Sequence, residues 1–191
     1  MKKQAIDSEG SMDRISQLPQ PLLHDILCFL SQKEAVQTSV LSKSWRYLGS
    51  TRPRLHFHEQ YFYRNKEKLP SVLDKTLQRY HDQKLRINNF SLKMFRNDSE
   101  SISVLKKWIP IVIFNMGVKT FKLSFLPNDG YFGLPYVFFK SETLQSLFLC
   151  GRIFIQTPID NVIVWKHLQT LVLEEVYIED ETMDMIVENM G

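Results

Sequence analysis

The sequence predicts a mixed protein of helices and parallel strands, between the α+β and α/β classes. Three short helices come first and a short solenoid of parallel strands follows them. Two observations predict this order. Residues 13–49 carry helix start and stop signals around apolar segments. From residue 71, helical segments alternate with four short strands that share one pattern, apolar at positions 1, 4 and 6.

Composition is compatible with this class. The chain has 191 residues, of which 43% are hydrophobic and 24% are charged, as in an ordinary globular protein. Its first residues are polar, and we expect a disordered tail over 1–11. The length allows one domain of ordinary size or two small ones.

The first helix is predicted to have two apolar faces. Pro21 suits the first position of a helix. In the segment 22–30, one face carries Leu22, Ile26 and Phe29, the other carries Leu23 and Leu27, and Leu30 borders both. Such a band is wider than one small core requires.

Two further helices follow. Ser31 and Glu34 form a capping box for the second helix, and a third runs from Ser42 to Gly49. Three helices in about forty residues rarely fold alone without a metal or a disulfide. The extra apolar surface on the first helix therefore indicates a binding site for another protein, or a surface that packs onto the rest of this chain.

Residues 51–70 are predicted to be a connector of basic and aromatic residues, with a short strand at 55–57 entering the next domain. Aromatic and basic side chains together also bind nucleic acid, by stacking on bases and contacting phosphates. That alternative ranks low because no nucleic-acid fold motif frames these residues. They are Arg52, Arg54, Tyr61, Phe62, Tyr63, Arg64, Lys66 and Lys68.

The segment 71–191 contains about four strand units. Their patterns begin at Ile87, Val118, Leu144 and Leu168, with spacings of 31, 26 and 24 residues. The near-constant period is typical of leucine-rich repeats, whose units run roughly 20–29 residues. The alternative is an ordinary α+β domain that shares the pattern by chance.

Helices are expected between and after these strands. The sequence predicts them over 72–80, over 99–115 and over 182–187. Pro110 is expected to distort the second one, because proline removes a backbone donor from the helix interior.

Strand alternation sends positions 3, 5 and 7 of each pattern to the face opposite the core. That face runs from basic through apolar to acidic along the chain. Phe148 and Val172 are the expected anchors for a target, because an exposed aromatic ring beside an aliphatic residue suits a binding hot spot. Alternatively, a loop from the connector covers them. The predicted target-binding residues are Lys93, Lys122, Phe148, Val172 and Glu174.

No catalytic constellation is found, so we expect no enzyme activity, no metal and no cofactor. The chain has no phosphate loop, zinc-protease motif or nucleophile elbow. His56 and His58 share a strand face, but structural zinc needs four ligands, so two solvated histidines are favoured. Cys150 and His167 could form a nucleophile and a base, but a packing or surface thiol is the favoured interpretation of Cys150.

Two cysteines, Cys28 and Cys150, cannot form a disulfide framework, which favours a reducing compartment. The longest charge-free run, 108–118, is too short to span a membrane, so we expect a cytoplasmic or nuclear protein without a membrane partner. The net charge of +3 divides into +8 over 1–107 and −5 over 108–191. This asymmetry indicates two partner surfaces, or a chance drift of sign along the chain.

Three N-terminal motifs carry a resemblance to a known family. They are the Leu18-Pro19 opening, the Ile-Leu-x-x-Leu at 26–30 and the Leu-Ser-Lys-Ser-Trp-Arg at 41–46. In this order and spacing they resemble the F-box of plant F-box/leucine-rich-repeat (F-box/FBD/LRR-like) proteins. Gly49 departs from the family, which often has Trp there. The resemblance continues in Trp108-Ile109, Leu134-Pro135 and Thr143-Leu144.

The resemblance implies a non-catalytic substrate receptor of a Skp–cullin–F-box ubiquitin ligase. The F-box, 12–50, would bind a Skp-type adaptor and through it a cullin–RING ligase, and the repeats would bind an unknown target. Family members continue with further repeats and an FBD domain, which we expect this chain to lack. A shortened protein that binds the adaptor without a working target site is the alternative. The adaptor-binding residues implied are Leu18, Pro19, Leu22, Ile26, Leu27 and Trp45.

Overall fold

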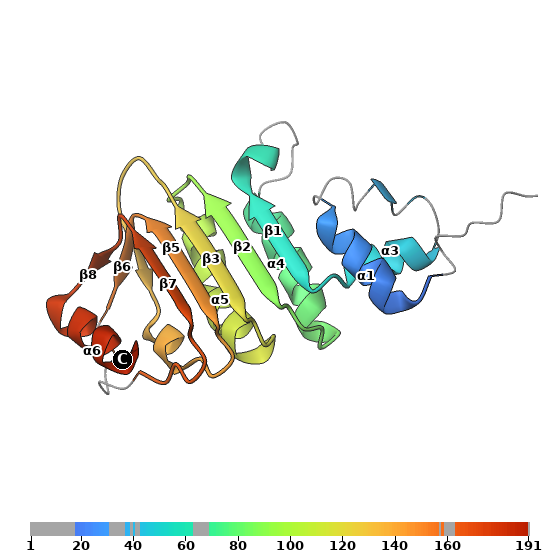
Figure 1. The fold of residues 1–191 in the computed structure, drawn as a ribbon. Helices are drawn as coiled ribbons and strands as arrows, with labels where there is room; N and C mark the ends of the chain where they lie inside the picture. The colour runs from blue at the N-terminus through green and yellow to red at the C-terminus, as the bar shows by residue number, and fades with distance from the viewer. Residues whose placement is uncertain are drawn as a thin grey trace, which may run out of the picture. The chain divides into compact units, whose positions relative to one another are not determined.

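The computed structural model describes residues 18–30, 37–38, 40, 43–62, 69–156, 158 and 163–190 (Figure 1). The predicted tail, 1–11, lies outside them. Contacts divide the chain into two compact units, Met1–Arg52 and Pro53–Gly191, which we call the N-terminal and C-terminal units. Among the described helices, none is long and apolar enough to cross a membrane.

The N-terminal unit contains helices α1 (Gln20–Phe29) and α3 (Lys43–Ser50). A proline occupies the first turn of α1, and the helix ends where Leu30 becomes extended. Residues 37 and 38, within the second predicted helix, are helical, whereas its capping box at 31–34 lies outside the described residues. The core of this unit is small and consists of Leu23, Leu27, Trp45 and Leu48, with Leu18 and Leu30 packed against it.

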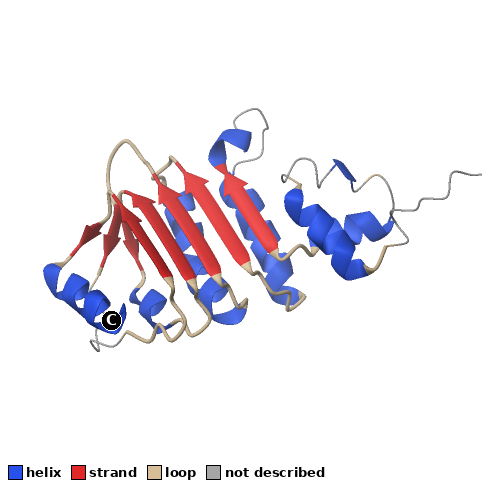
Figure 2. Ribbon diagram, viewed as in Figure 1, coloured by secondary structure: helices blue, strands red, loops and turns tan. Residues whose placement is uncertain are grey.

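The C-terminal unit is built on a parallel sheet of five strands in the order β1-β2-β3-β5-β7, the main sheet (Figure 2). Its strands are β1 (Arg54–His58), β2 (Asn89–Met94), β3 (Thr120–Phe125), β5 (Ser146–Gly151) and β7 (Thr170–Glu174). The last four overlap the four predicted patterns, and each begins two residues after the start of its pattern. The strand expected at 55–57 joins the same sheet as β1, which the predicted connector did not anticipate.

The strand register agrees with the repeated pattern. Residues at pattern position 4 lie opposite one another across the sheet, and so do those at position 6. Both rows face the core, because alternate residues of a strand point to one face. Leu171 and Leu173 are only half-buried, unlike the expected core positions, because β7 has a described neighbour on one side only.

Helices cover one face of the main sheet. In Figure 1, α4 (Leu69–Asp82) and α5 (Ser99–Asn115) lie behind β1, β2 and β3. The chain also forms the 3₁₀ helices η1 (Glu59–Phe62) and η2 (Tyr136–Lys140), and ends in α6 (Asp180–Met190). The helix expected at 99–115 has these bounds, and it continues past Pro110. The other two helices are longer than predicted.

A second, three-stranded parallel sheet was not predicted. Its strands β4 (Phe132–Leu134), β6 (Ile153–Ile155) and β8 (Tyr177–Ile178) each follow a long strand of the main sheet. The chain turns between the two sheets at Gly151, with φ of 97°, and at Glu175, with φ of 55°. A Cβ at residue 151 would lie 2.3 Å from the Phe125 carbonyl oxygen, so only glycine fits there.

The core of the C-terminal unit lies between the sheets and the helices and is rich in aromatic residues. The Phe90 and Phe121 rings stack with centroids 5.3 Å apart. Trp108 is buried, and its indole Nε1 donates a hydrogen bond of 2.7 Å to Asp74 Oδ1, which links α5 to α4. Helices and parallel strands therefore combine as the predicted fold class requires.

Candidate protein interaction surfaces

The first candidate surface is the exposed side of α1. Leu22, Ile26 and Phe29 are spaced four and three residues apart, so they lie on one helix face, which we call the α1 apolar face. Their exposed fractions are 50%, 36% and 86%. Leu23 and Leu27, on the other face, are almost completely buried. The division into two faces that the sequence predicts is therefore present.

The structure separates the six residues implied for adaptor binding. Leu22 and Ile26 belong to the α1 apolar face, and the exposed Pro19 precedes it. Leu27 and Trp45 are instead core residues, 0% and 4% exposed, so they can act on a partner only through the packing of α1 on α3. Leu18 is half-buried against this core.

The implied set lacks Phe29, the most exposed large apolar side chain of α1. Its helical spacing from Leu22 and Ile26 is the signal that places it on the same face.

The second candidate surface is the face of the main sheet that points away from α4 and α5, which we call the open face. Strand pairing arranges its side chains in rows across the five strands. The middle row is His56, Ser91, Lys122, Phe148 and Val172. The next row is His58, Lys93, Ser124, Cys150 and Glu174. All five predicted target-binding residues therefore share one face.

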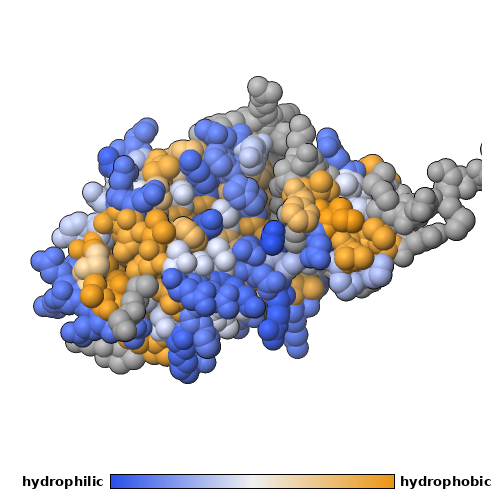
Figure 3. Space-filling view, viewed as in Figure 1, coloured by the Kyte–Doolittle hydropathy of each residue, from blue (hydrophilic) through white to orange (hydrophobic). Residues whose placement is uncertain are grey.

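The open face changes character from β1 to β7. Its β1–β3 part carries Arg54, two histidines and two lysines, whereas Phe148 and Val172 form an apolar part over β5 and β7. Figure 3 shows apolar surface gathered over these two strands, with hydrophilic surface beside it. Phe148 and Val172 are half-buried rather than fully exposed, because neighbouring side chains of the rows flank them.

Aromatic rings hold the two lysines of this face. Lys122 Nζ lies 4.1 Å from the centroid of the Phe148 ring, and Lys93 Nζ lies 5.6 Å from that of Phe95. Such cation–π contacts leave the ammonium charge uncompensated. With the carboxylates that the structure describes, neither lysine forms an ion pair.

Both histidines of β1 favour their neutral form. Partial desolvation, and then the Lys122 charge, lower the pKa of His56. Desolvation, then Lys93 and His56, lower the pKa of His58. The Gln60 backbone N–H also donates a hydrogen bond of 3.2 Å to His58 Nδ1, which occupies the lone pair that protonation would need. Among the described residues, no three metal-ligating side chains gather around these histidines.

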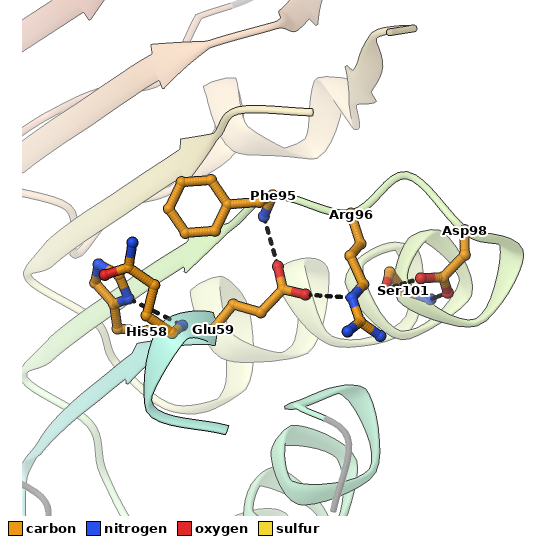
Figure 4. Close-up of polar contacts among 7 residues, drawn as sticks. His58, Glu59, Phe95, Arg96, Asp98 and Ser101 are labelled. Atoms are coloured by element: carbon orange, nitrogen blue, oxygen red, sulfur yellow. Dashed lines mark hydrogen bonds and ion pairs between the residues drawn. The ribbon is translucent and has the colours of Figure 1, made fainter. Parts of the chain in front are cut away.

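A buried carboxylate fixes the carboxyl ends of β1 and β2 (Figure 4). Glu59 Oε2 accepts a hydrogen bond of 2.6 Å from the Phe95 backbone N–H, and Glu59 Oε1 lies 2.8 Å from Arg96 Nε. These contacts keep the Phe95 ring beside His58, with centroids 5.8 Å apart. Glu59 therefore holds the basic part of the open face in place.

The row that begins with His58 and Lys93 ends on β7 with an acidic residue, Glu174. Cys150 lies opposite Glu174, and burial followed by the Glu174 carboxylate raises the pKa of the Cys150 thiol. His167 precedes the amino end of β7, whereas Cys150 is at the carboxyl end of β5, so the structure does not bring them together. The geometry therefore places the Cys150 thiol beside a carboxylate that favours its protonated form, and not beside His167.

The basic connector is described only in part. Tyr61 is exposed and Arg52 is buried, while Tyr63, Arg64, Lys66 and Lys68 lie outside the described residues.

The second sheet carries a groove that sequence reasoning missed. Its volume is about 380 Å³, and its lining residues are Tyr131, Gly133, Phe154 and Tyr177. The Phe154 and Tyr177 rings lie 5.3 Å apart, and a Cβ at residue 133 would meet no other atom within 4 Å. These residues lie on or beside β4, β6 and β8, which are far apart in the sequence, and the sequence gives no signal that they meet.

Comparison with known proteins shows which proteins the chain is similar to. Residues 15–57 match the F-box domain family. An F-box/LRR-repeat protein of Arabidopsis thaliana is 33% identical over 177 residues, which cover 89% of this chain and 33% of that protein. An F-box/FBD/LRR-repeat protein of the same plant is 34% identical over 177 residues, covering 92% and 39%. No solved structure matches the chain.

The chain is therefore similar to the F-box domain family over residues 15–57 and to plant F-box/LRR-repeat proteins over most of its length. This confirms the resemblance inferred from its motifs. The match runs beyond the predicted F-box, 12–50, and ends within β1. The chain spans about a third to two fifths of the length of these relatives.

Proposed function

We propose that this chain is a substrate-receptor subunit of a Skp–cullin–F-box ubiquitin ligase. The N-terminal unit binds a Skp-type adaptor through the α1 apolar face, and the C-terminal unit presents the open face to a target protein. Other subunits of the ligase transfer ubiquitin, so this chain has a non-catalytic role. The F-box match and the similarity to F-box/LRR-repeat proteins support the proposal.

The exposed α1 apolar face is the observation that carries the adaptor-binding role. Three large apolar side chains lie in solvent on a unit whose core has only four fully buried ones among the described residues. Burying one such side chain is worth roughly 1.5–3 kcal/mol, so a partner that covers all three gains substantial affinity. Such a partner would also add to a core that is small for an independent unit.

For the C-terminal unit we propose a short leucine-rich-repeat solenoid. Supporting it, four strands with one apolar pattern lie in register, with α5 between β2 and β3 and the 3₁₀ helix η2 between β3 and β5. Each repeat packs its strand against the strands of the neighbouring repeats, as in other stacked repeats. The opposite face carries Lys93, Lys122, Phe148, Val172 and Glu174, the residues proposed for target binding.

A calorimetric titration with a Skp-type adaptor tests this proposal. The double variant Leu22→Ala with Phe29→Ala is expected to weaken adaptor binding at least a hundredfold, because two buried contacts are lost. Tyr131→Ala, which truncates an exposed ring of the C-terminal unit, is the matched control and should bind like the wild type. Equal affinities for all three proteins would contradict the proposal.

A further inference from the structure

The charge distribution of the open face points to the chemistry of its partner. On β1, β2 and β3, the outward residues are basic or neutral, and none of them is a carboxylate. Glu59, which follows β1, is turned into the protein and paired with Arg96. The carboxylate Glu174 lies at the far edge of the face, on β7. A partner with negative charge over β1–β3 and none over β7 is therefore complementary.

The two lysines are suited to bind such a charge. Their ammonium groups lie on the Phe148 and Phe95 rings and have no carboxylate partner among the described residues. A ring that positions the side chain lowers the entropic cost of binding an anion. Because His56 and His58 favour their neutral forms, the outward positive charges of β1–β3 are those of Arg54, Lys93 and Lys122.

The spacing of these groups fits an extended polypeptide. Neighbouring strands lie about 4.8 Å apart, so Phe148 on β5 is one strand from Lys122 on β3 and about 10 Å from β2. An extended chain rises about 3.3 Å per residue. In a polypeptide bound across the strands, a carboxylate that contacts a lysine and an apolar side chain that contacts Phe148 are then two or three residues apart.

We propose that the open face binds an extended acidic segment of the target polypeptide, laid across the strands. Its carboxylates bind Lys93 and Lys122, and an apolar side chain two or three residues nearer β7 packs on Phe148 and Val172. Glu174 repels acidic residues at that end and so fixes the direction of the segment. This inference rests on the proposed function, which makes the open face the target surface.

Fluorescence anisotropy of labelled peptides on the full chain tests it. The probe is a ten-residue peptide with the core Asp-Asp-Ser-Leu, and its partner has Asn-Asn-Ser-Leu. We expect the acidic peptide to bind at least tenfold more tightly in 50 mM salt and to lose that advantage at 500 mM. Equal binding of the two peptides, or none at millimolar concentration, overturns the proposal.

Variants locate the binding. Lys93→Gln with Lys122→Gln should abolish the preference for the acidic peptide, whereas Lys75→Gln with Lys106→Gln, two exposed lysines on α4 and α5, should preserve it. Phe148→Ala should lower the affinity for the acidic peptide to the affinity of the wild-type chain for the same peptide with Ala in place of Leu. If the control pair matters as much as the test pair, the assignment to the open face is wrong.

Two further measurements separate this proposal from its alternatives. Tighter binding of a single-stranded DNA twelve-mer, lost in the same lysine pair, would make the face a nucleic-acid site and overturn the peptide proposal. Adaptor titration into the Lys93 and Lys122 variant should be unchanged. If this variant loses the preference for the acidic peptide but still binds the adaptor, the lysines act at the open face alone. If the wild-type chain binds the acidic peptide but not the adaptor, only the ligase proposal is contradicted.

Discussion

Lys122 and Phe148 lie directly opposite each other on β3 and β5, with the ammonium 4.1 Å from the centroid of the ring. This contact joins the basic and the apolar parts of the open face. It also shows that Phe148 points away from the core that its neighbour Leu147 helps to fill.

The two neighbours should therefore respond differently to truncation. Leu147→Ala is expected to reduce the free energy of unfolding by about 2–5 kcal/mol, because it leaves a cavity in the core. Phe148→Ala should cost clearly less, since its ring is half-buried on the surface. Denaturant unfolding of both variants beside the wild type measures the difference. A larger loss for Phe148→Ala would invalidate the strand register and the open face with it.

The Glu59 carboxylate is expected to stabilise the C-terminal unit. Glu59→Ala removes the acceptor of the Phe95 N–H and the partner of Arg96, and should cost about 1–3 kcal/mol. Glu188→Ala, at an exposed position of α6, should change the unfolding free energy by less than about 0.5 kcal/mol. Equal unfolding curves for the two variants would show that Glu59 has no such role.

Asp98 should stabilise α5 in a pH-dependent way. Its Oδ1 accepts a hydrogen bond of 2.9 Å from the Ser101 N–H at the helix start, and this bond is the main cause that lowers the pKa of Asp98. Asp98→Ala is expected to cost about 1 kcal/mol at pH 7. Because the folded pKa is the lower one, this stabilisation exists above the unfolded pKa of about 3.9 and is lost as pH falls through the folded pKa.

Unfolding in urea at pH 7 and near pH 3 measures the Asp98 effect. The gap between variant and wild type should shrink on acidification. A gap that is constant or grows would mean that the carboxylate charge does not contribute to the cap.

Hydrogen exchange on the full chain should show that the N-terminal unit is the less stable one. With four fully buried core residues described, amides of α1 and α3 should exchange faster than those of β3 and become protected when a Skp-type adaptor is added. Protection of α1 in the free chain equal to that of β3 would contradict this expectation.

Much of the fold follows from local pattern. The apolar residues that include Phe90, Phe121 and Leu147 recur with period two in short segments, which fixes strand and face together. The second sheet could not be predicted, because β8 has two residues and the turns at Gly151 and Glu175 depend on the neighbouring strands.

The candidate surfaces, too, could be predicted from the sequence only in part. Helical spacing alone separates Leu22 and Ile26 from the buried Leu27. The contacts of Glu59 with Phe95 and of Lys122 with Phe148 join residues 36 and 26 positions apart, and a sequence without an alignment contains no signal for either.

The proposed binding of this chain to a Skp-type adaptor is tested most directly by light scattering during size-exclusion chromatography. The full chain of 22.6 kDa is mixed with an excess of a Skp-type adaptor. We expect a 1:1 complex that survives the column and is lost in the Leu22→Ala with Phe29→Ala variant. Elution of the wild-type chain and the adaptor as two separate species at micromolar concentration would contradict it.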